Sequence, residues 1–144
     1  LSKKIGAKTV LITFNNVDDI KYIDKMLKVF VGPEIISGST RMKSGTTTKM
    51  ILNMISTITM IKLNKVYNNL MIDLKISNDK LFQRAIDIIS MIAKCDKGIS
   101  KQYLSNARGN VKAAILMKKK DISYIQAIKI LDDFKGDLNK ILLS

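Results

Sequence analysis

The chain has 144 residues, of which 47% are hydrophobic, and this size and composition indicate one globular domain with a small addition. No run approaches the roughly 20 apolar residues that a membrane span needs, and with no histidine and one cysteine neither a structural zinc site nor an internal disulfide is expected. The lone cysteine and the absence of a signal-peptide pattern are typical of a cytoplasmic protein.

The formal net charge of +13 raises the question of nucleic-acid binding. Only three of the 25 basic residues are arginines, the residue that nucleic-acid readers prefer for bidentate contacts. Apart from residues 118–120, the lysines are scattered along the chain. We therefore interpret the charge as a solvated surface and do not expect a nucleic-acid partner. A small basic nucleic-acid-binding protein is the minor alternative, and a steep salt dependence of duplex binding would support it.

Two apolar runs near the start predict a pair of parallel strands. Residues 7–14 and 26–31 are expected as strands and residues 18–25 as one or two helical turns, which together form a right-handed βαβ unit. Two strands alone would leave their edges and faces exposed. Because residues 1–6 also resemble the end of a helix, we expect the chain to be part of a longer protein.

A long helix is predicted over residues 40–66, with Ser39 or Thr40 as the N-cap. Apolar side chains nearly encircle its second half, so we expect it to be buried in the centre of a domain. Residues 67–76 are expected as a looser connection. The remainder is predicted to be helical, with helices at 79–94, 100–107, 110–119 and 122–134 and a last turn at 137–143.

Residues 32–49, GPEIISGSTRMKSGTTTK, hold the only proline, the only glutamate and three of the seven glycines. A strand end, a small polar turn and a helix start follow one another here, and a helix start presents free N–H groups and partial positive charge. This pattern predicts a site for an anion, and the expected ligand is a phosphorylated small molecule. The same residues also fit an ordinary turn and helix cap, and both interpretations are kept.

Several residues of this stretch would supply the chemistry of an anion site. Gly38 allows close approach of the backbone, and the remaining candidates offer hydroxyl donors or positive charge. The candidate ligand-binding residues are Ser37, Gly38, Ser39, Thr40, Arg41 and Lys43. No Walker A loop or Gly-x-Gly-x-x-Gly motif is present, and without histidine no Ser-His or Cys-His pair can form.

The motif residues Gly32-Pro33-Glu34, Ser37 to Lys43, Gly45-Thr46 and Lys49 closely resemble the signature of the N-acetylmuramic acid 6-phosphate etherase family, which the glucokinase regulatory protein shares. The resemblance continues through residues 50–54 and 65–73, and it extends to residues 6–9 and 110–112. It therefore covers essentially the whole chain, and its signature is long and specific.

This resemblance implies an α/β fold, in which a sugar isomerase (SIS) domain with a Rossmann-like parallel sheet precedes a mostly α-helical C-terminal subdomain. Residues 1–76 would be the C-terminal part of the SIS domain, including the signature helix, and residues 77–144 the helical subdomain. Residues 98–144 resemble a three-helix ubiquitin-associated fold. We expect this part to pack on the partner subunit's SIS domain and do not expect it to bind ubiquitin.

The resemblance also implies an activity. The family's lyases cleave the D-lactyl ether of N-acetylmuramic acid 6-phosphate, giving N-acetylglucosamine 6-phosphate and D-lactate during cell-wall recycling. The expected protein is a cytoplasmic homodimer that uses no metal and no organic cofactor. The family's acid and base are glutamates in the earlier half of the domain. We therefore expect no catalytic residue in this chain and no activity from the chain alone.

The resemblance assigns the six candidate residues above to sugar-phosphate contacts, and it gives Glu34, Lys49 and Asn53 structural or secondary roles. For Glu34 a role in capping the helix or holding the loop is favoured over a contact with a sugar hydroxyl or with Arg41. The alternative function is a non-catalytic regulator that binds a phosphosugar on the same fold. Two buried glutamates upstream would indicate the enzyme, and a duplicated SIS domain would indicate the regulator.

Overall fold

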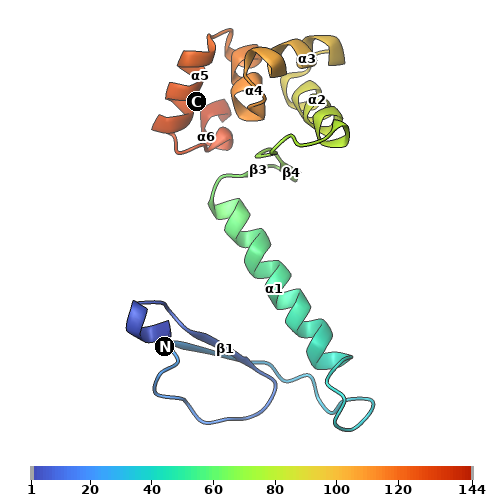
Figure 1. Ribbon diagram of the computed structural model, residues 1–144, viewed down its shortest axis with the longest axis vertical. Coiled ribbons are helices and arrows are strands. Elements are labelled where there is room, and N and C mark those ends of the chain that lie inside the picture. The colour runs from blue at the N-terminus through green and yellow to red at the C-terminus, as the bar shows by residue number, and fades with distance from the viewer. Residues whose placement is uncertain (1, 144) are drawn as a thin grey trace. The chain divides into compact units, whose positions relative to one another are not determined.

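The computed structural model describes residues 2–143, and the chain divides into two compact units, Leu1–Ser56 and Thr57–Ser144 (Figure 1). The division falls within helix α1, Lys43–Lys62, which begins in the first unit and ends in the second. The boundary expected at residue 76 concerns the domains of a longer protein and stays a prediction.

The first unit holds a short 3-10 helix, η1 (Ser2–Ile5), and two strands, β1 (Val10–Thr13) and β2 (Lys25–Lys28). The strands pair in parallel, with a register that runs from Val10 opposite Lys25 to Thr13 opposite Lys28. The predicted parallel pair is therefore confirmed, although both strands are shorter than expected. The chain is thus mixed α/β, with a short parallel sheet and mostly helices.

The connection between β1 and β2 differs from the prediction. Residues 14–24 contain bends and a turn but no helix, so the helical turns expected over residues 18–25 are wrong. The acidic side chain of Asp24 instead binds the residue just before β1. Its Oδ2 atom accepts hydrogen bonds from the backbone N–H (2.7 Å) and the hydroxyl (2.8 Å) of Thr9. These bonds hold the end of the connection against the start of β1.

Helix α1 is also shorter than predicted, and its burial differs. It contains no buried residue, and Met50, Leu52 and Ile61 are each more than half exposed. The expectation of a buried central helix is therefore wrong for this chain as it stands. The apolar sequence is a property of the helix alone, whereas burial requires other elements to cover it.

The second unit begins with a small hairpin in the region predicted as a loose connection. Its strands are β3 (Val66–Tyr67) and β4 (Leu70–Met71), which pair in an antiparallel way. Asn68, at the turn, has a φ of 52°, a left-handed conformation that asparagine tolerates and that such tight turns need.

A bundle of helices follows the hairpin (Figure 1). The helical prediction for this region is confirmed, with small differences in the bounds. The helices are α2 (Asp79–Ala93), α3 (Lys97–Asn106), α4 (Val111–Lys120), α5 (Tyr124–Asp133) and α6 (Leu138–Leu143). Each of these five helices is preceded by a residue whose side chain accepts from the third backbone N–H of the helix, which stabilises the start. These caps are Asn78, Asp96, Asn110, Ser123 and Asp137.

The core of the second unit is centred on α4. Residues 113–116 of this helix are fully buried, and α2 packs its Ala85 and Ile89 against the same core. Between α1 and α2 the chain contributes Ile72, which is 1% exposed. No helix within residues 2–143 combines the length and the hydropathy that crossing a bilayer requires.

One lysine ties distant segments of the second unit together. Lys112 Nζ donates to the backbone carbonyls of Asn64 (2.7 Å) and Gly136 (3.1 Å), and the side chain of Asn64 donates to the carbonyl of Lys135 (3.2 Å). Partial burial lowers the pKa of Lys112. These bonds fix the chain just after α1 to the turn between α5 and α6.

Candidate functional site

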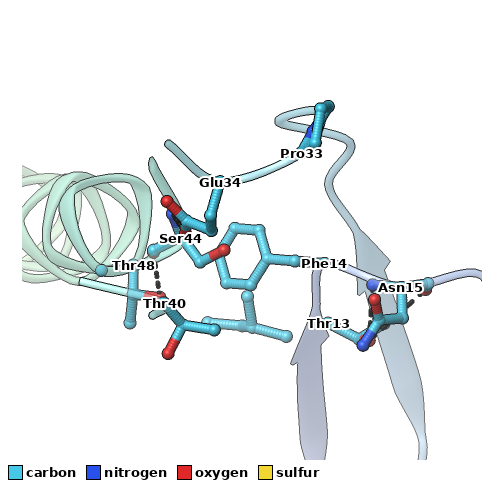
Figure 2. Close-up of a pocket in the computed structure, with 11 residues that line it drawn as sticks. Thr13, Phe14, Asn15, Pro33, Glu34, Thr40, Ser44 and Thr48 are labelled. Carbon is cyan, nitrogen blue, oxygen red and sulfur yellow. Dashed lines mark hydrogen bonds between the residues drawn. The ribbon is translucent and has the colours of Figure 1, made fainter. Parts of the chain in front are cut away.

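A pocket of about 650 Å³ lies in the first unit, where β1 ends and α1 begins. Parallel sheets usually bind their ligands at this carboxyl end of the strands. Figure 2 shows Thr13 and Phe14 on the strand side and Thr40, Ser44 and Thr48 on the helix side. The lining residues are Ile12, Thr13, Phe14, Asn15, Gly32, Pro33, Glu34, Thr40, Ser44, Gly45 and Thr48.

Glu34 connects the loop after β2 to the start of α1. Its Oε2 accepts from the backbone N–H of Lys43 and its Oε1 from that of Ser44, both at 3.0 Å. The first N–H groups of a helix lack partners within the helix, so the carboxylate satisfies two of them and complements the helix dipole. The bond from Ser44, and next the bond from Lys43, lowers the pKa of Glu34 below its usual 4.5. Glu34 therefore caps α1, a place expected for Ser39 or Thr40.

Lys43 is held by the same loop. Its Nζ donates to the carbonyl of Pro33 at 2.6 Å, and the side chain is half-buried. On the helix side of the pocket, the hydroxyl of Thr48 donates to the carbonyl of Ser44 at 2.8 Å. The bond from Lys43 Nζ to Pro33 and the two backbone bonds to the Glu34 carboxylate join the Pro33–Glu34 segment to the start of α1. These three bonds fix one wall of the pocket.

The predicted site residues are only partly gathered at the pocket. Thr40 lines it, whereas Ser37, Gly38 and Arg41 lie in an exposed turn outside the lining. This turn is closed by a bond from the Ser39 N–H to the Ile36 carbonyl (3.0 Å), and Gly38 has a φ of +81°, which glycine adopts without strain. The role of these residues in binding a sugar phosphate stays a prediction.

The two secondary candidates, Lys49 and Asn53, are exposed on α1 and do not line the pocket. Arg41 is also exposed, and no ion pair to Glu34 occurs among the described residues, whose ion pairs involve other carboxylates. The carboxylate of Glu34 is directed to the backbone of α1, as described above. Within residues 2–143 no three metal-ligating side chains gather into a cluster.

Sequence reasoning missed several residues of the pocket. Thr13 and Asn15 lie at and just after the end of the first strand, a position where ligand-binding side chains are expected. Thr40, Ser44 and Thr48 recur every four residues, a spacing that places side chains on one face of a helix. Both signals were present in the sequence and would have identified the polar lining.

Glu34 gives the start of α1 a defined pH dependence. Its folded pKa is lowered, so its stabilising bonds are fully present above the ordinary pKa of 4.5 and are lost as the pH falls through the folded pKa. We expect the backbone amide resonances of Lys43 and Ser44 to move together as the pH is lowered from 6 to 3. Glu34→Gln should flatten this titration. A wild-type titration identical to that of the variant would contradict the assignment.

Comparison with known proteins first defines the class of the helical part. Residues 68–129 match the family model described as the C-terminal lid domain of glucokinase regulatory protein. This match extends from the turn of the hairpin into the first part of α5, and it agrees with the observed change from a short parallel sheet to a helical bundle.

The curated relatives then define the family. An N-acetylmuramic acid 6-phosphate etherase 1 of Bacillus licheniformis is 47% identical over 98% of this chain and 47% of the relative. An N-acetylmuramic acid 6-phosphate etherase of Bacillus subtilis is 44% identical over the same shares. One from Petrotoga mobilis is 51% identical over 81% of this chain and 40% of the relative. The chain belongs to this etherase family, which confirms the resemblance, and it spans about half the length of the curated relatives it matches.

Proposed function

We propose that this chain is a segment of an N-acetylmuramic acid 6-phosphate etherase, a lyase that cleaves the D-lactyl ether to give N-acetylglucosamine 6-phosphate and D-lactate. The observation that carries this proposal is the identity of 44% to 47% to etherases over 98% of the chain. The pocket at the carboxyl end of β1 lies within that similarity and offers polar groups that suit a sugar.

In this proposal the first unit is part of a SIS-type domain with a parallel sheet, and residues 77–144 form the helical subdomain. The parallel register of β1 and β2 supports the domain type, because two parallel strands that need covering on both faces are typical of α/β folds. The position of the pocket beyond the strand ends supports it as well.

We place the phosphorylated amino sugar in the pocket. The hydroxyls of Thr13, Ser44 and Thr48 can exchange hydrogen bonds with sugar hydroxyls. The neighbouring turn would receive the phosphate, with Arg41 supplying a bidentate contact and the N–H groups near Ser39 supplying further donors. Lys43 would contribute positive charge while its amine holds Pro33.

The elimination needs one carboxylate to remove the proton beside the open-chain aldehyde and one acid to protonate the leaving lactate. Among the lining residues that the structure describes, Glu34 is the only acid, and both of its oxygens accept bonds from the start of α1. We therefore assign Glu34 to positioning and place the acid and base on other parts of the etherase polypeptide. The complete enzyme is proposed to act in the cytoplasm as a homodimer, without a metal or an organic cofactor.

The test is release of D-lactate from N-acetylmuramic acid 6-phosphate. A chimera would carry this chain in place of the aligned region of the Bacillus subtilis relative, and the 144-residue chain alone would be assayed beside it. We expect lactate release by the chimera and none above a blank by the chain alone. Release by the chain alone would refute the assignment of the acid and base to other parts of the polypeptide.

A second candidate is a phosphosugar-binding regulator without turnover, which the match to the lid domain of glucokinase regulatory protein favours. The same chimera distinguishes the two functions. Binding of N-acetylmuramic acid 6-phosphate without any release of lactate would favour the regulator. Release at a steady rate would favour the etherase.

A further inference from the structure

One strand of the hairpin in the second unit continues past the end of its partner. The ladder extends one residue beyond β3 and β4, where the Ile72 N–H donates to the Lys65 carbonyl at 3.0 Å. The partner strand ends there, because Asn64 adopts a left-handed φ of 56° and joins the hairpin to α1. Among the described residues, no backbone N–H or carbonyl of residues 73–76 has a hydrogen-bond partner. These groups remain open to a partner.

Residues 72–76 alternate in burial as a strand does. Ile72 is 1% exposed, and Leu74 and Ile76 pack against the core of the second unit. Asp73 and Lys75, which lie between them, are exposed. A period of two places successive side chains on opposite faces, which is the geometry of an extended chain. The segment is therefore an unpaired strand edge, with apolar side chains on one face and charged side chains on the other.

A pocket of about 550 Å³ follows this edge, and only residues of the second unit line it. The lining consists of residues 72–76, residues 108–111 and Lys65. Five consecutive lining residues show that the pocket runs along the backbone of the segment. A strand that pairs with a neighbour lies roughly 4.8 Å from it, so the pocket provides space for another extended chain beside this edge.

The charges around the pocket favour an acidic partner. Its charged lining residues are Lys65, Lys75 and Arg108, with Asp73 as the carboxylate. Asp73 Oδ2 is already paired with Lys65 Nζ at 2.8 Å. The ion pairs of the described residues include neither Lys75 nor Arg108, and the Arg108 guanidinium is held 5.1 Å from the centre of the Tyr124 ring. The pocket thus keeps two positive charges that an acidic chain would complement.

We propose that residues 73–76 bind a partner protein by strand addition, and that the partner segment is an extended peptide in which acidic and β-branched residues alternate. Main-chain hydrogen bonds to the open N–H and carbonyl groups supply the affinity in this mode, and alternate side chains supply the specificity. The β-branched side chains pack beside Leu74 and Ile76, and the acidic side chains face Lys75. This surface is independent of the etherase activity, because none of its residues lines the pocket of the first unit.

The experiment titrates the isotope-labelled 144-residue chain with a capped peptide of sequence Glu-Val-Glu-Val-Glu-Val. We expect the amide resonances of residues 73–76 to shift, and their hydrogen exchange to slow at least about fivefold at saturation. Lys75→Glu should weaken binding at least about threefold, because it places like charges opposite one another. Lys119→Glu is the matched control, since it makes the same charge change at an exposed residue of α4 outside the pocket. An unchanged helical circular dichroism signal verifies that both variants fold.

Two control peptides separate strand addition from a general effect of charge. A peptide with lysine in place of each glutamate should bind at least about tenfold more weakly, because its charges repel the pocket. N-methylation of alternate amides in the acidic peptide should abolish binding, because it removes the donors of one strand edge. Equal binding by either control peptide, equal effects of Lys75→Glu and Lys119→Glu, or no binding of the acidic peptide would overturn the proposal.

Inorganic phosphate and the etherase chimera provide two further tests. If phosphate alone shifted the same amides and displaced the peptide, the pocket would be a site for small anions and the proposal would be wrong. In the chimera the amides of residues 73–76 should exchange freely until the peptide is added. Protection without peptide would show that the enzyme itself covers this edge, and it would refute the proposal. A chimera that binds the peptide but releases no lactate would support strand addition and count against the etherase alone.

Discussion

Replacing Glu34 by alanine in the etherase chimera should lower kcat/KM for N-acetylmuramic acid 6-phosphate about 100-fold, since a displacement of about 1 Å in a positioning element can cost that much. Without the carboxylate, the N–H groups of Lys43 and Ser44 lose their acceptors, the two Glu34 oxygens that lie 3.0 Å from these nitrogens. The loop carrying Pro33 would then separate from the helix start, and one wall of the pocket would lose its fixed position. The measurement is steady-state lactate release at increasing substrate concentration.

Two controls separate positioning by Glu34 from proton transfer and from unfolding. Glu34→Gln keeps one oxygen acceptor and should recover part of the loss. Above pH 4.5, the ordinary pKa of Glu34, the pH profile of kcat should be unchanged, because Glu34 stays ionised there and transfers no proton in our proposal. Ile35→Ser, at an adjacent residue that is 72% exposed, should behave like the parent. Loss of a limb above pH 4.5 in Glu34→Gln would instead make Glu34 an acid or base of the reaction.

Leu116→Ala should lower the free energy of unfolding of the second unit by about 2–5 kcal/mol, the usual cost of truncating a buried leucine to alanine. Leu116 is fully buried in α4, at the centre of the core, where the neighbouring helices leave little room to collapse around a cavity. The measurement is urea unfolding of the chain, followed by its helical circular dichroism signal.

Ile125→Ala is the matched control for Leu116→Ala. Ile125 lies on α5 and is 81% exposed, so its truncation leaves no cavity and should change the free energy of unfolding by less than about 0.5 kcal/mol. Equal effects of the two substitutions would show that α4 is not the centre of the core. A change in the slope of the unfolding curve for Leu116→Ala would indicate an altered denatured state.

The helical part was predictable from the sequence because its signals are local. The N-cap at Asn78, for example, is a short polar side chain placed just before an apolar repeat, and the structure shows it accepting from Leu81 N–H. Helix α2 carries its buried residues at helical spacing, as the pattern around Ala85 and Ile89 predicts. Such signals depend on residues within one or two turns, so they persist whatever the rest of the protein does.

The sequence predicted the polar pocket in the right region, but most of the residues predicted to bind a ligand do not line it. The predicted residues run from Ser37 to Lys43, and of these only Thr40 lines the pocket. The rest of the lining comes from the end of β1, from the loop at Gly32–Glu34 and from one face of α1. Glu34 lies nine and ten residues before Lys43 and Ser44, whose amides it caps. Which residues of a loop face a pocket depends on the path of the loop, and the order of residues does not specify that path.

The sequence by itself determined the parallel strands, the helices of the second unit and the membership in the etherase family, because each depends on local periodicity or on a long contiguous signature. Only the tertiary structure decided that α1 is uncovered, that residues 14–24 form no helix, and that Glu34 caps α1. Burial and long-range hydrogen bonds need segments that are distant in sequence to meet. The apolar pattern of α1 therefore indicates that the helix needs to be covered, and the tertiary structure shows whether other segments of this chain cover it.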